Sequence, residues 1–303
     1  MNVGLVGLGK IGTGVASNVL KCGFTLTVYD IDKDRVRIVE KLGARGVNSP
    51  MEVAATSDIV LLSLPSPSIS EKVVMGEDGL LSSARRGLII VEMSTVHPGS
   101  IKNLAKQANK LGVEVIESPV TGGSQGANRG TLHLIVGGDK DTLKQCRPVL
   151  ESFSRMITHV GKLGSGSVVK LINNVLSIHN QVGVFQAFLL AAKSTKEYGV
   201  SLQTVYDVIN EGTGSSWILD EVGGKILAGE EVGDNMILWE KDIGLALQMA
   251  SELGISLPIH TALFGQVMAW ITMGITGDST EVAQYLGDHA NVKILGAGEK
   301  GTK

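Results

Sequence analysis

The chain has 303 residues, of which 43% are hydrophobic and 19% charged, and its formal net charge is −3. Its length exceeds the roughly 100–200 residues of one ordinary domain, so we expect two domains, and this composition excludes intrinsic disorder. Lys and Arg number 27 against 30 Asp and Glu without a basic run, which argues against nucleic acid and membrane surfaces as partners. Because Cys22 and Cys146 form no C-x-x-C and the histidines no H-x-x-x-H, we expect a cytoplasmic protein without a disulfide framework or metal site.

The first half of the chain alternates short apolar runs with amphipathic stretches. The runs occupy residues 3–6, 26–29, 59–62, 88–91, 113–116 and 132–136. Such alternation is typical of βαβ units, and it predicts an α/β domain with a mainly parallel sheet.

The pattern changes after residues 161–166, GKLGSG, to long helical segments. We therefore predict domains at residues 1–162 and 163–303, the second all-helical and opened by a long helix over residues 167–198. Residues 171–192 and 253–277 contain no Asp, Glu, Lys or Arg, but their Asn, Gln and His residues favour buried helices over membrane spans. The polar tail, residues 296–303, is expected to be disordered.

Residues 7–12, GLGKIG, follow the first apolar run and fit the pattern G-x-G-x-x-G. A strand before, a helix after and a second strand ending at Asp30 form the context of a dinucleotide-binding loop. The expected contacts come from the turn at Gly7, the close approach at Gly9 and the helix packing at Gly12. The predicted cofactor-binding residues of this loop are Gly7, Leu8, Gly9, Lys10, Ile11 and Gly12. A glycine turn without a ligand is the alternative.

Asp30 closes the second predicted strand. Its carboxylate can accept both hydroxyls of an adenosine ribose and would repel a 2′-phosphate, so we expect NAD rather than NADP. Two alternatives stay open: Asp30 only caps the next helix, or Lys33 and Arg35 admit the phosphate.

Lys170 and Asn174 are spaced i and i+4 near the start of the long predicted helix, so their side chains share one face. A lysine that is buried or lies beside a cofactor loses proton affinity and becomes a usable acid or base. Asn174 would orient the same substrate oxygen. A snorkelling lysine beside a core asparagine is the alternative.

Four further segments resemble motifs of the β-hydroxyacid dehydrogenases, such as 3-hydroxyisobutyrate dehydrogenases and tartronate-semialdehyde reductases. Residues 92–98, EMSTVHP, are similar to the D-x-S-T-x-x-P segment beside the nicotinamide, and residues 118–123, SPVTGG, to the A-P-V-S-G-G substrate loop. Residues 164–174 fit the catalytic-helix signature G-x-G-x-x-x-K-x-x-x-N. Residues 241–246, KDIGLA, resemble a segment that places a lysine at the active site.

The resemblance implies a Rossmann-type first domain, an interdomain cleft, and hydride transfer between NAD(H) and a small β-hydroxyacid or semialdehyde. The substrate would be similar to 3-hydroxyisobutyrate, tartronate semialdehyde or succinic semialdehyde. Lys170 would be the general acid/base that also stabilises the developing oxyanion, and Asn174 would orient the hydroxyl. The implied carboxylate-binding residues are Thr121, Gly122 and Gly123, and the further cofactor contacts are Leu64, Pro65, Thr95 and Lys241.

Three positions depart from the family pattern: Glu92 replaces Asp, His97 replaces a small polar residue and Thr121 replaces Ser. The Thr121 methyl is expected to trim the substrate pocket. His97 either favours a polar or anionic distal group of the substrate or only starts a helix. We expect substrate-distinguishing contacts from residues 215–217.

The main interpretation is therefore an NAD-dependent 3-hydroxyacid dehydrogenase or reductase. A non-catalytic dinucleotide-binding interaction protein and an imine reductase are the alternatives, and the presence of Lys170 argues against both. The apolar helical surface after Leu253, together with the resemblance, predicts a homodimer or homotetramer.

Overall fold

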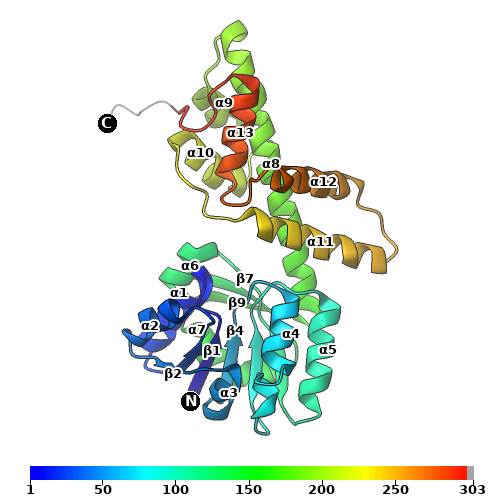
Figure 1. Ribbon diagram of the computed structural model, residues 1–303. Coiled ribbons are helices and arrows are strands. Elements are labelled where there is room, and N and C mark those ends of the chain that lie inside the picture. Colours follow the sequence, from blue (N-terminus) through cyan, green and yellow to red (C-terminus); the bar gives the residue numbers. More distant parts are fainter. Residues whose placement is uncertain (299–303) are drawn as a thin grey trace. The chain divides into compact units, whose positions relative to one another are not determined.

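The computed structural model describes residues 1–298 and divides the chain into two compact units, Met1–Leu171 and Ile172–Lys303 (Figure 1). Residues 299–303, and with them the end of the predicted disordered tail, lie outside the described residues. The predicted domain boundary between residues 162 and 163 stays a prediction, because the division after Leu171 falls inside a continuous helix.

The first unit is built on one sheet in the strand order β3-β2-β1-β4-β5-β6-β8-β7, with β9 beside β8. The first six strands in this order, from β3 through β2, β1, β4 and β5 to β6, pair in parallel, whereas β8 runs antiparallel to β6 and β7. The order 3-2-1-4-5-6 is that of dinucleotide-binding folds, and it confirms the predicted mainly parallel α/β sheet. The strands are β1 (Asn2–Val6), β2 (Thr25–Tyr29), β3 (Arg45–Gly46), β4 (Ile59–Leu62), β5 (Ile89–Glu92), β6 (Glu114–Glu117), β7 (Val120–Thr121), β8 (Leu132–Gly137) and β9 (Ser154–Gly161).

Helices cover both faces of this sheet (Figure 1). In β4, Ile59 and Leu61 join the core beneath α1, α2 and α7, whereas Val60 and Leu62 join the core beneath α3, α4 and α5. Both sets are buried because successive side chains of a strand point to opposite faces. The helices are α1 (Lys10–Lys21), α2 (Lys33–Glu40), α3 (Pro50–Thr56), α4 (Pro67–Met75), α5 (Pro98–Asn109), α6 (Gly123–Arg129) and α7 (Lys140–Glu151).

The second unit is helical throughout its described residues, as predicted. Its aromatic core includes Phe185, Phe188, Trp239 and Trp270, with the rings of Phe185 and Trp239 stacked at 6.5 Å between centroids. The helices are α8 (Ser165–Tyr198), which begins in the first unit, α9 (Leu202–Asn210), α10 (Gly224–Ala228), α11 (Met236–Glu252), α12 (Pro258–Thr272) and α13 (Thr280–Ala290), and a π-helical turn, Leu219–Gly223, precedes α10.

Helix α8 confirms the long helix predicted over residues 167–198 and begins two residues earlier. Among the described residues it alone is long and apolar enough to cross a membrane, judged by length and composition only. Its most apolar window is 44% buried inside the protein, and Phe185 and Phe188 of this helix are fully buried in the helical core. Packing within the protein therefore accounts for part of its apolar composition.

Candidate functional site

The loop GLGKIG joins β1 to α1 in a conformation that requires its glycines. Gly7 has φ +95°, and a Cβ added there would lie 2.2 Å from the Ser63 carbonyl oxygen. A Cβ at Gly12 would lie 2.0 Å from the Gly7 carbonyl oxygen. The predicted turn at Gly7 and the predicted tight packing at Gly12 therefore both appear in the structure.

Gly9 is different, because a Cβ there would meet only Arg35, 3.9 Å away at Nη1. Gly9 is the N-cap of α1, and no side chain caps the first N–H groups of this helix. Open space in front of these uncapped N–H groups suits an anion such as a pyrophosphate. The residues of this loop thus fit a bound dinucleotide.

Asp30 is buried at the end of β2 and holds the loop itself. Its Oδ2 accepts the Leu8 N–H at 2.6 Å, and its Oδ1 accepts the Asp32 N–H at 2.8 Å. Each oxygen retains a second lone pair that a ribose hydroxyl can use. The N-cap of α2 is Asp32, so the alternative that Asp30 caps this helix is wrong.

The basic residues near Asp30 already have local partners. Arg35 pairs with Asp32 at 3.1 Å between Nε and Oδ2, and the Lys33 ammonium lies 5.2 Å from the centre of the Tyr29 ring. Both pairs are exposed or half-buried, and interactions of this strength give way easily to a ligand. The preference between NAD and NADP therefore depends on two residues: Asp30, which would repel a 2′-phosphate, and Arg35, which would admit it.

The loops after β4 and β5 lie at the same edge of the sheet, because parallel strands end there together. Leu64 and Pro65 follow β4, and the Leu64 N–H donates to the Ser94 hydroxyl at 2.8 Å. Ser94 in turn donates its N–H to Glu92 Oε1 at 2.8 Å, and Thr95 comes next in the chain. One chain of hydrogen bonds thus joins Leu64 to Ser94 and Glu92, and the predicted contacts Pro65 and Thr95 are the next residues in these two loops.

Glu92 lies at the base of this chain and is fully buried at the end of β5. Burial raises the pKa of its carboxyl from 4.5 to about 7, although the hydrogen bonds from Ser94 oppose the rise. His97, three residues beyond Ser94, is the N-cap of α5, and its Nδ1 accepts the Gly99 N–H at 3.1 Å. This contact supports the helix-start interpretation of His97.

The predicted substrate loop continues from β6 into β7 and α6. Gly122 and Gly123 are exposed and have φ of +116° and +61°, and Thr121 is half-buried. Exposed glycines carry no side chain that would cover their backbone N–H groups, which leaves room for a ligand such as a carboxylate. The arrangement at residues 121–123 is therefore compatible with the predicted role.

Lys170 lies on α8, half-buried, at the end of the first unit. The start of this helix is held by Glu117, whose carboxylate accepts the N–H groups of Gly164, Gly166 and Ser167. Lys170 follows Ser167 by three residues, so it lies one helical turn beyond this contact.

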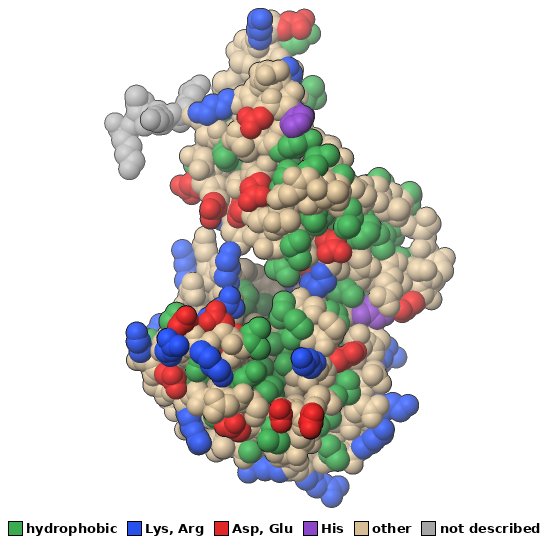
Figure 2. Space-filling model, in the orientation of Figure 1, with side chains coloured by type: hydrophobic (Ala, Val, Ile, Leu, Met, Phe, Trp, Pro, Cys, Tyr) green, Lys and Arg blue, Asp and Glu red, His purple; other side chains and the backbone are tan. Residues whose placement is uncertain are grey.

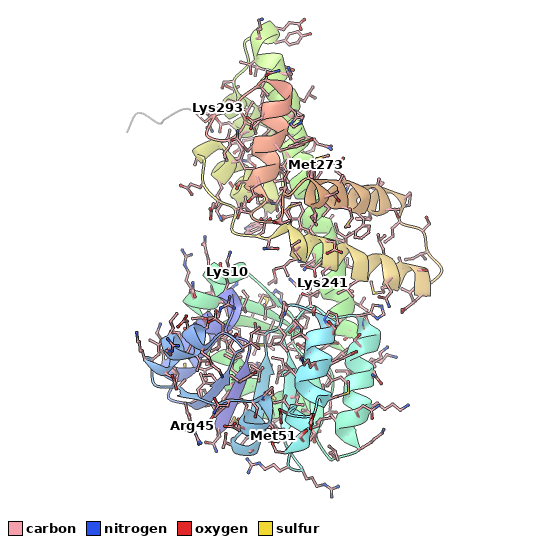
Figure 3. The ribbon with its side chains drawn as sticks, viewed as in Figure 1. Lys10, Arg45, Met51, Lys241, Met273 and Lys293 are labelled. Atoms are coloured by element: carbon pink, nitrogen blue, oxygen red, sulfur yellow. The ribbon has the colours of Figure 1, made fainter. Side chains whose placement is uncertain are left out.

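Asn174 and Lys241 belong to the second unit, where Asp242 joins them. The Asn174 amide donates to Asp242 Oδ2 at 2.6 Å, and the Lys241 ammonium lies 2.7 Å from Asp242 Oδ1. All three side chains are buried or half-buried. Figure 3 shows Lys241 on α11 of the second unit. In the first unit it shows Lys10 at the start of α1, at the edge opposite to Arg45 and Met51.

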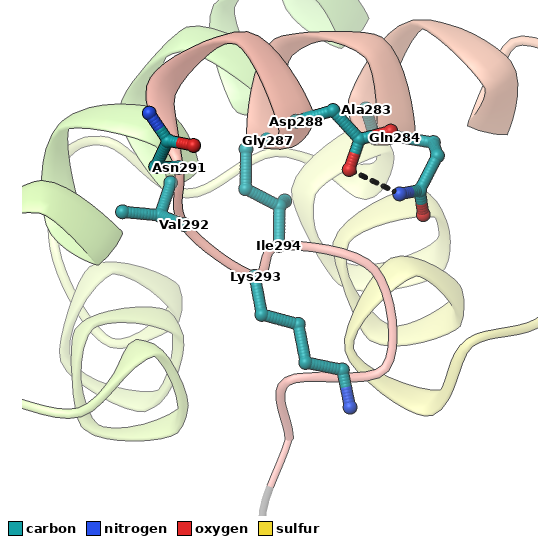
Figure 4. A pocket seen from close by; sticks show the side chains of 8 residues that line it. All are labelled: Ala283, Gln284, Gly287, Asp288, Asn291, Val292, Lys293 and Ile294. Carbon is teal, nitrogen blue, oxygen red and sulfur yellow. Dashed lines mark hydrogen bonds between the residues drawn. The ribbon is translucent and has the colours of Figure 1, made fainter.

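The second unit has two surface hollows, and neither Lys170 nor Asn174 lines either of them. One, of about 370 Å³, is formed by the end of α13 and the segment after it, and includes Asp288 and Lys293 (Figure 4). The other, of about 660 Å³, is lined by Ser215, Ser216 and the exposed Trp217, the residues expected to distinguish substrates. Its other lining residues include three carboxylates, Asp207, Glu211 and Asp220, which would repel a carboxylate substrate.

Glu117, Ser94 and Asp242 are the polar residues that the sequence reasoning did not assign to the site. Glu117 directly precedes the segment SPVTGG, Ser94 lies within EMSTVHP, and Asp242 follows Lys241. Their positions beside recognised motifs were the available signal. The described residues contain no group of three or more His, Cys, Asp and Glu placed to hold a metal ion.

Comparison with known proteins matches both halves of the chain. A family model for the NAD-binding domain of 6-phosphogluconate dehydrogenase matches residues 2–161, and a model described as NAD-binding of NADP-dependent 3-hydroxyisobutyrate dehydrogenase matches residues 164–286. A 2-(hydroxymethyl)glutarate dehydrogenase of Eubacterium barkeri is 36% identical over 269 residues, which cover 88% of each chain. The chain belongs to the 3-hydroxyisobutyrate dehydrogenase family of β-hydroxyacid dehydrogenases.

Two further relatives agree with this family. A 2-hydroxy-3-oxopropionate reductase of Escherichia coli (strain K12) is 34% identical over 259 residues, covering 85% of this chain and 87% of the relative. The solved structure of a Mycobacterium tuberculosis 3-hydroxyisobutyrate dehydrogenase with L-serine superposes with a TM-score of 0.82 at 25% identity, covering 94% of this chain and 98% of that one. As a β-hydroxyacid dehydrogenase the chain is an NAD(P)-dependent oxidoreductase, and the predicted enzyme class is confirmed.

Proposed function

We propose that this β-hydroxyacid dehydrogenase transfers a hydride between NAD(H) and the alcohol carbon of a small β-hydroxyacid, or of the matching semialdehyde. The main support is one edge of the first unit's sheet. There β2 ends at Asp30, β1 leads into the open loop at Gly9, and β4, β5 and β6 lead into the segments that contain Leu64, Thr95 and Thr121. The edge therefore combines groups suited to a dinucleotide with groups suited to a carboxylate.

The names of the relatives support a narrower substrate class. 2-(Hydroxymethyl)glutarate, 2-hydroxy-3-oxopropionate and 3-hydroxyisobutyrate share a carboxylate, a substituted middle carbon, and a primary alcohol or aldehyde on the next carbon. They differ in the group on the middle carbon. We propose a substrate of this class, with succinic semialdehyde less favoured because one more carbon separates its aldehyde from its carboxylate.

The chain's own residues would divide the chemistry as follows. The Thr121 hydroxyl and the N–H groups of Gly122 and Gly123 bind the carboxylate. In oxidation the neutral Lys170 amine takes the proton of the substrate hydroxyl, and a hydride leaves the carbon that bears this hydroxyl. The product is then an aldehyde, and the lysine becomes an ammonium. In reduction the ammonium returns the proton to the aldehyde oxygen. Asn174 orients that oxygen, and a bound nicotinamide accepts or supplies the hydride.

A substrate panel tests the function. The purified enzyme is assayed by NADH absorbance with 3-hydroxyisobutyrate, 2-(hydroxymethyl)glutarate, L-serine and tartronate semialdehyde, each with NAD(H) and with NADP(H). We expect turnover of at least one compound and a lower KM for NAD(H), because Asp30 disfavours a 2′-phosphate. No turnover in the whole panel would contradict the function, and a lower KM for NADP(H) would contradict the cofactor assignment.

Lys170→Ala tests the proposed acid/base. We expect kcat to fall at least about 10²-fold, the usual contribution of general acid–base catalysis, while the Kd of NADH stays within about two-fold. Lys193→Ala, an exposed lysine on the same helix, is the matched control and should keep full activity. Full turnover by Lys170→Ala would remove Lys170 from the mechanism.

The remaining expectations stay predictions. These are the cytoplasmic location and the absence of nucleic-acid, membrane and metal partners. The two alternative functions are disfavoured by the presence of Lys170 and Asn174, for which a non-catalytic binding protein has no use.

A further inference from the structure

Glu117 is a buried carboxylate that the proposed reaction does not use. It is the last residue of β6 and has no exposed surface. Oε1 accepts the Gly164 N–H at 2.5 Å and the Gly166 N–H at 2.8 Å, and Oε2 accepts the Ser167 N–H at 3.0 Å and the Ser167 hydroxyl. One side chain thus satisfies four donors at the start of α8.

These contacts replace a local cap. The first N–H groups of any helix lack partners within the helix and carry partial positive charge, so a carboxylate there both accepts their hydrogen bonds and opposes their charge. A nearby Ser, Asp or Asn usually serves this purpose. In α8 the acceptor comes from 47 residues earlier in the chain. The contact therefore ties together two separate segments as well as capping a helix.

Two glycines make room for the carboxylate. A Cβ added at Gly137, which pairs with Glu117 across β6 and β8, would lie 2.3 Å from Glu117 Oε1. A Cβ at Gly166 would lie 3.0 Å from Glu117 Cγ and 2.7 Å from the Ile135 carbonyl oxygen. Because these positions hold glycine, the carboxylate can lie directly against the helix backbone.

The two segments that Glu117 joins carry the two halves of the proposed chemistry. Its backbone leads directly into residues 118–123, the substrate loop, and the Ser118 N–H donates to the Glu92 carbonyl oxygen at 2.7 Å. Its side chain holds residues 164–167, and Lys170 follows one turn later on α8. Glu117 therefore connects two parts of the proposed site. Its backbone leads into the substrate loop, and its side chain holds the turn of α8 that precedes Lys170.

We propose that Glu117 is a positioning residue that fixes the first turn of α8, and with it the Lys170 amine, against the substrate loop. The proposal rests on the proposed function in so far as Lys170 is the acid/base. Proton transfer and hydride transfer occur on the same alcohol group, so a small displacement of the amine relative to the bound carboxylate slows the reaction.

Glu117→Gln tests this role by kinetics. The amide keeps one acceptor oxygen but turns an NH₂ group toward N–H donors, so we expect kcat to fall by about 10- to 100-fold, as second-shell changes and misplacements of this size commonly cause. The KM for NAD(H) should stay within about two-fold, because the loop at Gly9 is untouched. Glu117→Asp keeps the charge and should recover part of kcat. A kcat of Glu117→Gln within about two-fold of wild type would overturn the proposal, as would equal losses in both variants.

Hydrogen–deuterium exchange gives a readout that does not depend on turnover. In Glu117→Gln the backbone amides of residues 164–171 should exchange faster than in wild type, and those of residues 2–21 should not change. If the wild type were inactive on every substrate, the proposed function would fail, but this measurement would still report on the contact between Glu117 and the start of α8. Unchanged exchange at residues 164–171 would overturn the proposal that Glu117 fixes the start of this helix.

A matched serine pair covers the case in which Glu117 variants do not fold. Ser167→Ala removes one of the four donors, whereas Ser165→Ala removes a buried hydroxyl that has no partner among the described residues. We expect kcat of Ser167→Ala to fall about three- to ten-fold, the effect of one lost hydrogen bond of ordinary strength, and that of Ser165→Ala to stay unchanged. Equal kcat values in the two variants would overturn the proposal.

Discussion

Glu92 and Glu117 lie side by side at the ends of β5 and β6, in register, and both are fully buried. Their surroundings differ. Glu117 accepts four donors, whereas Glu92 accepts the Ser94 N–H and has its pKa raised to about 7 by burial. A buried carboxyl with few donors is more stable protonated, so Glu92 changes charge close to neutral pH. This places a titrating group directly beneath the loop of Ser94 and Thr95.

The raised pKa of Glu92 predicts a pH-dependent stability. A group whose folded pKa is above its unfolded value of 4.5 contributes stability fully below pH 4.5 and loses it as the pH rises through about 7. Glu92→Gln is neutral at every pH. Its free energy of unfolding relative to wild type should therefore grow by about 3 kcal/mol between pH 4.5 and 8, as measured by urea unfolding.

The control for this measurement is Glu77→Gln, because Glu77 is exposed in the same unit. It removes a carboxylate that is not buried, so the comparison separates the effect of burial from that of losing a charge. If the Glu92→Gln difference did not change with pH, the carboxyl of Glu92 would titrate alike in the folded and unfolded states, and the link between burial and charge would be wrong.

At the scale of elements, helix α1, which follows the loop GLGKIG, is hydrogen-bonded to helix α6, which follows the predicted substrate loop. The Asn18 amide of α1 donates to the carbonyl oxygens of Ala127 and Asn128 at 2.8 and 3.4 Å, and to that of Gly14 at 2.9 Å. A Cβ at Gly14 would lie 2.7 Å from the Ala127 backbone, so the two helices touch closely. Helices α1 and α6 are thus joined by hydrogen bonds as well as by close packing.

Asn18→Ala tests this attachment. The substitution removes the amide donor to the Ala127 and Asn128 carbonyl oxygens of α6, although the Ala127 oxygen still accepts the Gly130 N–H, and a lost hydrogen bond typically costs about 0.5–1.5 kcal/mol. We expect the free energy of unfolding to fall by that amount and the KM for the carboxylate substrate to rise, because α6 begins at Gly123. Asn103→Ala, at an exposed position of α5, should change neither quantity. Equal stabilities of the two variants would show that α1 and α6 are held by apolar packing alone.

Elements with strong apolar runs were predicted well, and those without were missed. The six predicted strands appear as β1, β2, β4, β5, β6 and β8, each within about one residue, because strands buried on both faces need uninterrupted apolar side chains. Strand β9, Ser154–Gly161, is partly exposed and mixes polar with apolar residues. Strands β3 and β7 are two residues long. Their pairing depends on a neighbouring strand that is not local in the sequence.

At the scale of the whole molecule, the second unit exposes many large apolar side chains. Figure 2 shows apolar residues gathered on the visible face of this unit. The exposed large apolar residues of this unit include Ile172, Leu176 and Leu190 of α8, Ile237 and Leu238 of α11, Ile259 and Met268 of α12, and Met273 directly after α12. Exposed apolar surface of this kind marks protein–protein interfaces. It supports the prediction of a homodimer or homotetramer.

Self-association is expected to depend on this surface. The enzyme should sediment well above the 31.8 kDa of one chain. Ile259→Glu replaces a residue that is 62% exposed on α12, and it should lower the mass measured by analytical ultracentrifugation, because a charge is costly in an apolar interface. Leu42→Glu, 51% exposed in the first unit, is the control and should keep the wild-type mass. A monomeric wild type would contradict the predicted assembly.

The sequence alone determined the α/β sheet, the long helix α8, the loop GLGKIG and the family, because these depend on local patterns of apolar residues, glycines and short motifs. Residue spacing also predicted Lys170 and Asn174 on one face. Only the tertiary structure decided which polar groups hold these elements: Glu117 at the start of α8, Asn18 of α1 against α6, and Asp242 between Asn174 and Lys241. Their partners lie 49, 109 and 68 residues away in the chain. A buried carboxylate or amide must find donors or acceptors, but only the folded chain determines which distant groups come within reach.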